Sequence, residues 1–152
     1  VIDEETKRLI ENVIETMEKN EGIGLAAPQA GILKRVIIIA AEQGPAVFIN
    51  PKIIKESREK EIKEEGCLCL PELYLKIKRA KEIEVEALNK EGEKIKIQAK
   101  GLTARIFQHE IDHLNGILII DKISFWQKWK LKKKIQAFWS DWSLKIIIRY
   151  NS

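Results

Sequence analysis

The chain has 152 residues, of which 45% are hydrophobic and 33% are charged, and its 27 basic and 23 acidic side chains leave a formal net charge of +4. This length and composition suffice for one hydrophobic core, so we expect a single domain over residues 1–152. Charges of both signs are interspersed, as on an ordinary solvated surface. No apolar run approaches the roughly 20 residues that span a bilayer, and the acidic amino end differs from a secretory signal. We therefore expect no transmembrane segment and a cytoplasmic location, with an organelle as the alternative.

The predicted elements begin with an amphipathic helix over residues 4–20. Its apolar side chains repeat along one stripe: Leu9, Ile10, Val13, Ile14 and Met17. The small-residue segment GIGLAAPQ (22–29) follows as a loop. RVIIIA (35–40) and AVFIN (46–50) are predicted to be buried strands, and we expect the second to end at Asn50 and Pro51.

The middle of the chain, residues 53–100, alternates mostly with the period of two that indicates strands. EIEVEAL and EKIKIQAK flank the turn residues NKEG, which predicts a hairpin. LTARIFQHEIDHLNG (102–116) returns to helical spacing, with Gly116 where a helix commonly ends. The fold class is α+β: largely antiparallel sheets packed around a central helix, with N-terminal and C-terminal helices. Residues 123–152 are predicted to be a basic, Trp-rich helical extension, helical at least as far as Trp139.

The segment QHEIDHLNG contains the only two histidines of the chain, His109 and His113, four residues apart. On a helix, both rings can reach one metal ion, with the carboxylate of Glu110 beside it. Two core histidines bonded to backbone are the alternative. Zinc proteases share this spacing, but the long form of their motif has a third histidine where this chain has Ile119.

A third metal ligand is expected upstream, because no Glu or His follows His113. Cys67 in EEGCLCLPE is the candidate, since a thiolate binds Zn²⁺ or Fe²⁺ strongly. Cys69 lies two residues on, and in an extended segment both sulfurs would point to one side. A closed Cys₂His₂ structural site is therefore the alternative. Glu110 favours an open, catalytic site, because a closed site has no use for a carboxylate beside the ion.

Three segments in this order, GIGLAAPQ, EGCLC and QHEIDHLNG, resemble the three signature segments of peptide deformylases. The resemblance runs from about residue 4 to residue 123. It implies hydrolysis of the formyl group from the N-terminal formyl-methionine of new polypeptides, with release of formate. It also implies that Cys67, His109 and His113 are the metal ligands.

The resemblance also implies roles for the residues around the metal. Glu110 would act as general base and then as general acid. The oxyanion would be held by the Gln29 side-chain amide and the backbone N–H of Leu68, with the metal as third contact. The residues expected to bind substrate are Ile23 and Ile106, lining the methionine pocket, and Gly24 and Gly66, pairing with the peptide backbone. Ordinary core positions are the alternative for the two isoleucines.

Two further expectations concern the surroundings of the cysteine and histidines. Glu65 and Arg79 match positions that could pair and steady the Cys67 loop. Asp112 is expected to orient the helix or its histidines. One departure from the family is Cys69, where its second motif usually has serine, and this thiol could be a spare ligand or an oxidation partner.

The resemblance favours Fe²⁺ in cells, with Zn²⁺, Ni²⁺ or Co²⁺ as alternatives, because one thiolate with two neutral ligands makes a soft site. Basic C-terminal helices in this family suggest that WQKWKLKKKIQ (126–136) binds ribosomal RNA on the ribosome. An anionic membrane or packing on the core is the alternative, and we expect no DNA partner. Family members usually start about two dozen residues earlier, and a first residue of Val leaves open whether residues precede it.

Overall fold

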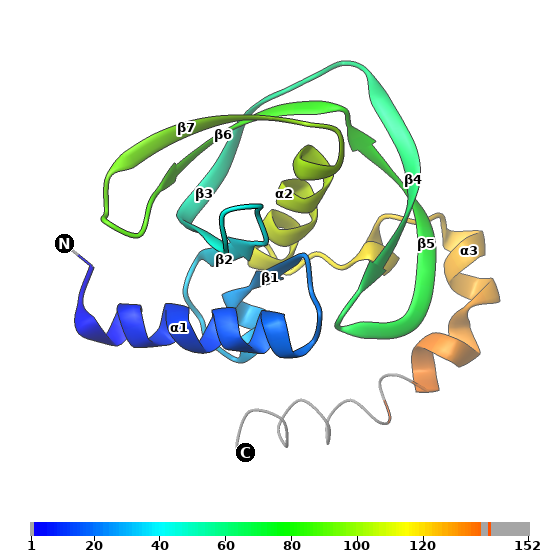
Figure 1. Ribbon diagram of the computed structural model, residues 1–152. Helices are drawn as coiled ribbons and strands as arrows, with labels where there is room; N and C mark the ends of the chain where they lie inside the picture. Colours follow the sequence, from blue (N-terminus) through cyan, green and yellow to red (C-terminus); the bar gives the residue numbers. More distant parts are fainter. Residues whose placement is uncertain (1, 138–139, 141–152) are drawn as a thin grey trace. The chain divides into compact units, whose positions relative to one another are not determined.

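The computed structural model describes residues 2–137 and 140 of the chain. Figure 1 shows these elements, in chain order: α1 (Glu4–Lys19), β1 (Gly24–Ala26), η1 (Ala27–Ala30), β2 (Val36–Ile39), β3 (Ala46–Glu56), β4 (Lys60–Cys67), β5 (Leu70–Ala80), β6 (Glu82–Leu88), β7 (Lys94–Lys100), α2 (Gly101–Leu114), η2 (Ile119–Asp121) and α3 (Phe125–Lys130). The chain divides into two compact units: Val1–Ile62 with Lys78–Ile117, and Lys63–Ile77 with Leu118–Ser152. The expected single domain stays a prediction.

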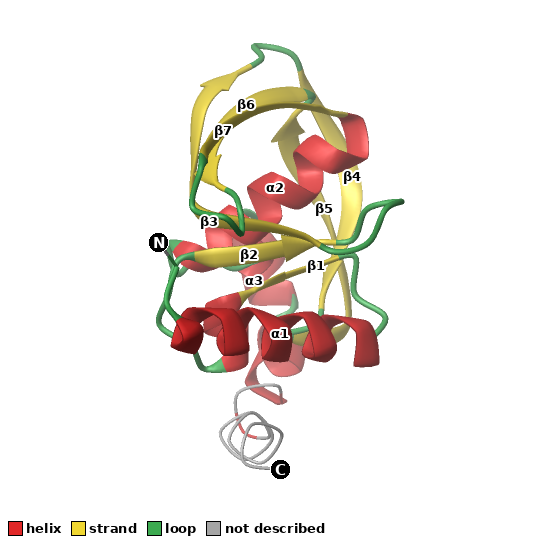
Figure 2. Ribbon diagram, turned by 60° about the vertical axis from the view of Figure 1, so that its left-hand side comes forward, coloured by secondary structure: helices red, strands yellow, loops and turns green. Residues whose placement is uncertain are grey.

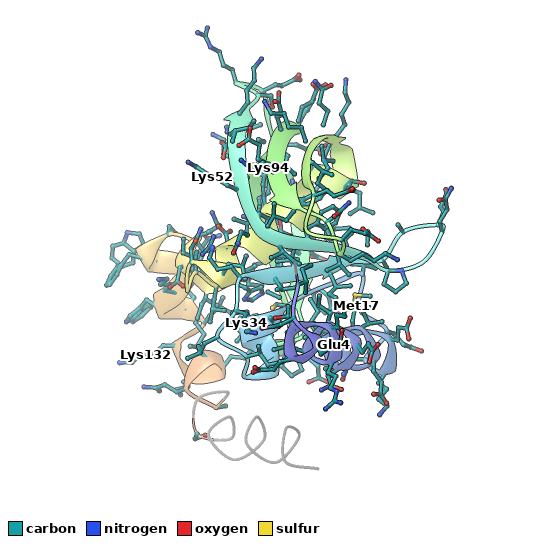
Figure 3. The ribbon with its side chains drawn as sticks, turned by 90° about the vertical axis from the view of Figure 1, so that its left-hand side faces the viewer. Glu4, Met17, Lys34, Lys52, Lys94 and Lys132 are labelled. Carbon is teal, nitrogen blue, oxygen red and sulfur yellow. The ribbon has the colours of Figure 1, made fainter. Side chains whose placement is uncertain are left out.

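Helix α1 begins at Glu4, as predicted, and ends at Lys19, one residue before the predicted end. The Asp3 carboxylate caps it by accepting a hydrogen bond of 2.8 Å from the Thr6 N–H. Hydrogen bonds from the Thr6 side chain, first, and from the Thr6 N–H, second, lower the pKa of Asp3, because both favour the ionised form. Figure 3 shows Met17 on α1 and Lys34 beside the helix, where the Lys34 ammonium donates to the Thr6 hydroxyl at 2.9 Å. The helix is thus fixed at its first turn and packed through its buried stripe.

The first unit is built on a five-stranded antiparallel sheet in the order β1-β2-β3-β6-β7. Strand β2 is buried on both faces. Val36 and Ile38 pack in the cluster that contains α1, whereas Ile37 and Ile39 pack in the cluster that contains α2. Figure 2 shows α1 and α2 on opposite sides of β1 and β2. The unbroken apolar run VIII therefore follows from two helices covering one strand.

Strand β3 does not end at Asn50 and Pro51, so that prediction was wrong. The strand continues to Glu56, and the register with β6 shifts between Ile49 and Lys52. Asn50 takes a left-handed φ of 51° at this irregularity. A bulge accommodates a residue of that conformation and a proline without an N–H to donate. The bulge bends the strand instead of ending it.

The predicted hairpin over EIEVEAL and EKIKIQAK is confirmed as β6 and β7. Its turn places Gly92 at a φ of 84°, a value that favours glycine. Glutamates of β6 face lysines of β7 across the outer face, with Lys100–Glu82 and Lys96–Glu86 ion pairs of 3.3 Å. The other face packs Ile83 and Val85 against α2. One face is solvated and the other belongs to the core.

The second unit has its own apolar cluster, formed by residues of the β4–β5 hairpin and of the segment after residue 117. Leu131 and Ile135 pack against this cluster. Ser124 caps α3, and its oxygen accepts from the Gln127 N–H at 3.3 Å. Residues 132–137 are again helical. The predicted helix to Trp139 is thus supported as far as 137, and Trp139 lies outside the described residues.

The α+β class with antiparallel sheets and a central helix is confirmed. None of the helices within the described part of the chain is both long enough and apolar enough to cross a bilayer.

Candidate metal site

Helix α2 places the two histidines of the chain on one face. The Nε2 atoms of His109 and His113 lie 3.2 Å apart, and the ring centroids are 4.9 Å apart. Two nitrogens bound to one tetrahedral Zn²⁺ at about 2.0–2.1 Å are separated by about 3.3 Å. The observed separation therefore suits two ligands of one ion. The i, i+4 spacing of the sequence produces this geometry directly.

The protonation state of His113 also suits a metal ligand. Burial is the main cause that lowers the pKa of His113 to about 3, with the neighbouring His109 and the Arg79 guanidinium as smaller causes. The imidazole is therefore neutral at physiological pH, which is the form that binds a metal. The two rings face each other through Nε2, the arrangement that two ligands of one ion require.

Cys67 completes a group able to hold a metal ion. The ligand atoms of Cys67, His109 and His113 all lie within 4.8 Å of one another. One thiolate and two imidazoles are a donor set that suits Zn²⁺ or Fe²⁺. The donor chemistry and the Nε2 separation thus both fit a divalent ion.

Cys69 is not part of this group. The expected alternation of an extended segment fails, because β4 ends at Cys67 and residues 68–69 form a turn. The turn takes Cys69 into the apolar cluster of the second unit, where it is buried beside Leu70 and Leu73. The closed Cys₂His₂ site therefore has less support than a site with three protein ligands.

Glu110 is buried on α2, next to Gly24 of β1. A Cβ at position 24 would lie 2.7 Å from Glu110 Oε1 and 2.9 Å from Ile106 Cγ2. Since real Cβ atoms do not approach other atoms so closely, only glycine leaves room for this carboxylate. The sequence places Glu110 beside the histidines, and the sheet holds it there.

The other predicted site residues are placed as follows. Gln29, in η1, accepts a hydrogen bond of 2.8 Å from the Ala26 N–H through Oε1, which orients its amide NH₂ as the donor end. Leu68 is exposed in the turn after β4, and Ile23 is 56% exposed, so Ile23 is not a core residue. Ile106 is buried against Gly24.

Two findings correct or extend the expectations for polar residues near the site. The structure pairs the buried Arg79 guanidinium with the carboxylate of Asp112 on α2, as expected for a residue that orients the helix. The pairing of Arg79 with Glu65 stays a prediction. Sequence reasoning missed Gln108, a buried amide directly before His109. Its signal was a polar residue on the same helix face as the apolar Ala104 and Ile111.

The site combines two facing histidines and a buried glutamate on one helix, with a cysteine near the histidines. This combination is typical of a metallohydrolase. A model of the family described as polypeptide deformylase matches residues 1–129. The chain belongs to this family, whose members are metal-dependent.

The relatives agree in sequence and in structure. A peptide deformylase of Thermotoga maritima is 47% identical over 133 residues, covering 88% of this chain and 81% of that protein. One from Halothermothrix orenii is 50% identical over 124 residues, covering 80% of each chain. A crystal structure of the Plasmodium falciparum peptide deformylase matches with a TM-score of 0.86 at 37% identity, covering 93% of this chain and 86% of that one.

Proposed function

We propose that Cys67, His109 and His113 hold one divalent metal ion beside Glu110, and that this site performs the reaction of the family. The chain removes the formyl group from the N-terminal formyl-methionine of newly made polypeptides and releases formate. The observation that carries the site is the group of three ligand atoms within 4.8 Å of one another. Family membership identifies the reaction, and the three ligand atoms offer a metal site at which it can take place.

The chemistry divides between the ion and the chain's own residues. A bound divalent ion supplies Lewis acidity, which lowers the pKa of water towards neutrality and polarises a carbonyl. The Glu110 carboxylate takes the proton of the attacking water and later gives it to the departing amine. The Gln29 amide and the Leu68 N–H donate to the oxyanion. Loss of one such donor typically costs about 3 kcal/mol of barrier, or a hundredfold or more in rate.

The direct test is formate release from a formyl-Met-Ala peptide by protein loaded anaerobically with Fe²⁺ or Ni²⁺. We expect release of one formate for each peptide that loses its formyl group, and no cleavage of the Met–Ala bond. The matched control is the same peptide without the formyl group, which should stay intact. Cleavage of the unformylated peptide would instead identify a metalloprotease, and bound metal without any hydrolysis a structural site.

Gly24 provides a second test, because it leaves the space that Glu110 occupies. We expect Gly24→Ala to lower kcat about a hundredfold, since a displacement of about 1 Å in a catalytic group has effects of this size. Gly44→Ala, in the exposed loop before β3, is the matched control and should leave kcat unchanged. Nothing lies within 4 Å of a Cβ there, and its φ of 108° makes the alanine lower stability only. Equal kcat losses in the two variants would contradict this account.

The proposed metal in cells is Fe²⁺. A single thiolate with two neutral imidazoles leaves a divalent ion with one net positive charge, which is a soft and weakly acidic centre. Zn²⁺, Ni²⁺ and Co²⁺ suit the same donors and are the alternatives. Metal content of protein purified without oxygen, measured by mass spectrometry, distinguishes them.

We further propose how the formyl-methionine is held. Ile23 and Ile106 would line the pocket for its unbranched side chain, and Gly24 and Gly66 would offer backbone to the extended peptide. Support comes from the exposed position of Ile23 and the close packing of Ile106 on Gly24. Glycine at these two positions allows another backbone to approach closely.

A ribosome contact through the C-terminal segment is also proposed, together with a cytoplasmic location. Phe125, Trp126 and Trp129 are 72%, 70% and 61% exposed on α3, among lysines. Leu131 and Ile135 face the apolar cluster instead, so these aromatics form a separate outer surface. Exposed aromatic and basic side chains suit the bases and phosphates of RNA.

Replacement of the lysines at 130 and 132–134 by alanine should weaken ribosome binding at least tenfold and reduce its salt dependence, since each phosphate contact contributes to both. Cosedimentation with ribosomes at two salt concentrations measures this. Formate release from a free peptide should stay unchanged. Unaltered ribosome binding would contradict the proposal. Binding of the wild-type protein to anionic vesicles instead of ribosomes would indicate that the segment binds a membrane.

A further inference from the structure

The end of β5 contacts α2 through consecutive residues. The Gly101 N–H, at the start of the helix, donates to the Lys81 C=O at 2.9 Å. The Ala80 N–H donates to Gln108 Oε1 at 3.0 Å, and Gln108 Nε2 donates back to the Ala80 C=O at 2.9 Å. Arg79 pairs with Asp112. Residues 81, 80 and 79 thus meet the helix at its first residue, its middle and its last turn.

The contact made by Gln108 is the most specific of these. Its amide closes a ring of two hydrogen bonds with the Ala80 backbone, as a neighbouring strand would do, and its Nε2 also donates to the Ala104 C=O at 2.9 Å. Gln108 and Ala80 are both buried, so water does not replace these bonds cheaply. No apolar or shorter side chain at 108 could make both.

The spacing of the contacts matches the spacing of the histidines. Gln108 directly precedes His109, and Asp112 directly precedes His113, so both pairs are four residues apart. Two contacts one turn apart on one side of a helix fix its rotation as well as its position along its axis. Beyond Lys81, the chain enters β6, an inner strand of the sheet. The helix is therefore held by a segment that continues into an inner strand of the sheet.

We propose that Gln108 and Asp112 are positioning residues that set the rotation of α2 and so the direction of His109 and His113 towards a shared metal ion. Gln108 does so through the Ala80 backbone, and Asp112 through Arg79. The inference rests on the proposed metal site. It assigns to Gln108 a role in metal affinity and coordination geometry, in addition to its part in the packing of the helix.

The test measures Co²⁺ binding, which does not depend on deformylation. Gln108→Met keeps the length of the side chain but removes its donors and acceptor. We expect Co²⁺ affinity, measured by chelator competition, to fall about 10–100-fold, the usual cost of losing a partner that orients a metal ligand. The visible absorption of bound Co²⁺ should also change, because the angle between the ligands changes.

Val13→Ala is the control for lost stability. Val13 is fully buried in the cluster around α1, which contains no residue of α2. We expect a lower Tm for this variant, but a Co²⁺ affinity within about twofold of wild type and the same spectrum, because no partner of a ligand is touched. If Gln108→Met does not fold, Asp112→Asn, which keeps the shape but not the charge, should change the spectrum and lower the affinity about threefold or more.

Wild-type affinity and spectrum in a folded Gln108→Met protein would overturn the inference and leave the proposed function standing. So would an equal loss of affinity in Val13→Ala. A wild-type protein that binds no Co²⁺ would overturn the proposed metal site and the inference together. Formate release by wild type, measured separately, distinguishes these cases.

Discussion

Replacement of Cys67 by serine should abolish metal binding and formate release, whereas Cys69→Ser should keep both. Cys67 belongs to the group of three ligand atoms, and Cys69 is buried among leucines. A serine hydroxyl is a poor ligand at neutral pH, because it does not ionise as a thiol does. The two variants make the same chemical change two residues apart, so each serves as the control for the other.

Metal content and formate release should be measured on both variants after anaerobic loading with Ni²⁺. Cys67→Ser should contain close to no metal per chain, and Cys69→Ser close to one. Loss of metal from Cys69→Ser would support a closed site with four protein ligands instead. Retention of metal and activity in Cys67→Ser would show that the third ligand is another residue.

Replacement of Glu110 by alanine or by glutamine should lower kcat about 10²–10⁴-fold, the usual contribution of a general acid–base, while the metal stays bound. Glutamine has the shape of glutamate and fits the space beside Gly24, so its loss of rate reports the missing proton acceptor alone. Alanine removes the side chain as well. KM should change little, because the carboxylate acts on the water and the leaving amine.

Glu11→Gln on the exposed face of α1 is the matched control, and it should leave kcat unchanged. Metal content must be reported for each variant, so that a lost ion is not taken for a lost base. Glu110→Gln with full metal content and wild-type kcat would remove Glu110 from the mechanism. Loss of the metal in Glu110→Gln would indicate that the carboxylate is itself a ligand.

Elements that depend on neighbouring residues could be predicted from the sequence. The apolar stripe of α1, the turn of the β6–β7 hairpin and the helix that carries both histidines all follow from patterns within a few residues. The i, i+4 spacing of His109 and His113 predicts that the two rings lie close together, and their Nε2 atoms are 3.2 Å apart. These predictions hold because the physical cause lies in the same segment.

Predictions failed where contacts with residues distant in the sequence determine the local structure. Strand β3 passes Asn50 and Pro51 because it pairs with β6, a strand that begins only at Glu82. Leu102 lies four residues before the buried Ile106 and so on the same face of α2, yet it is 64% exposed in the first turn of the helix. Periodicity indicates which residues share a face of a helix, but not how far along the helix that face is covered.

The sequence by itself determined the kinds of ligand, the acid beside them and the family, because these depend on residue types at given spacings. Only the tertiary structure decided that Cys69 turns into an apolar cluster, that Gly24 leaves room for Glu110, and that Gln108 joins α2 to Ala80. The physical reason is that each of these depends on packing between segments far apart in the chain. At such contacts, the free space and the backbone groups that need a hydrogen-bond partner decide which side chain fits, and the local sequence pattern does not.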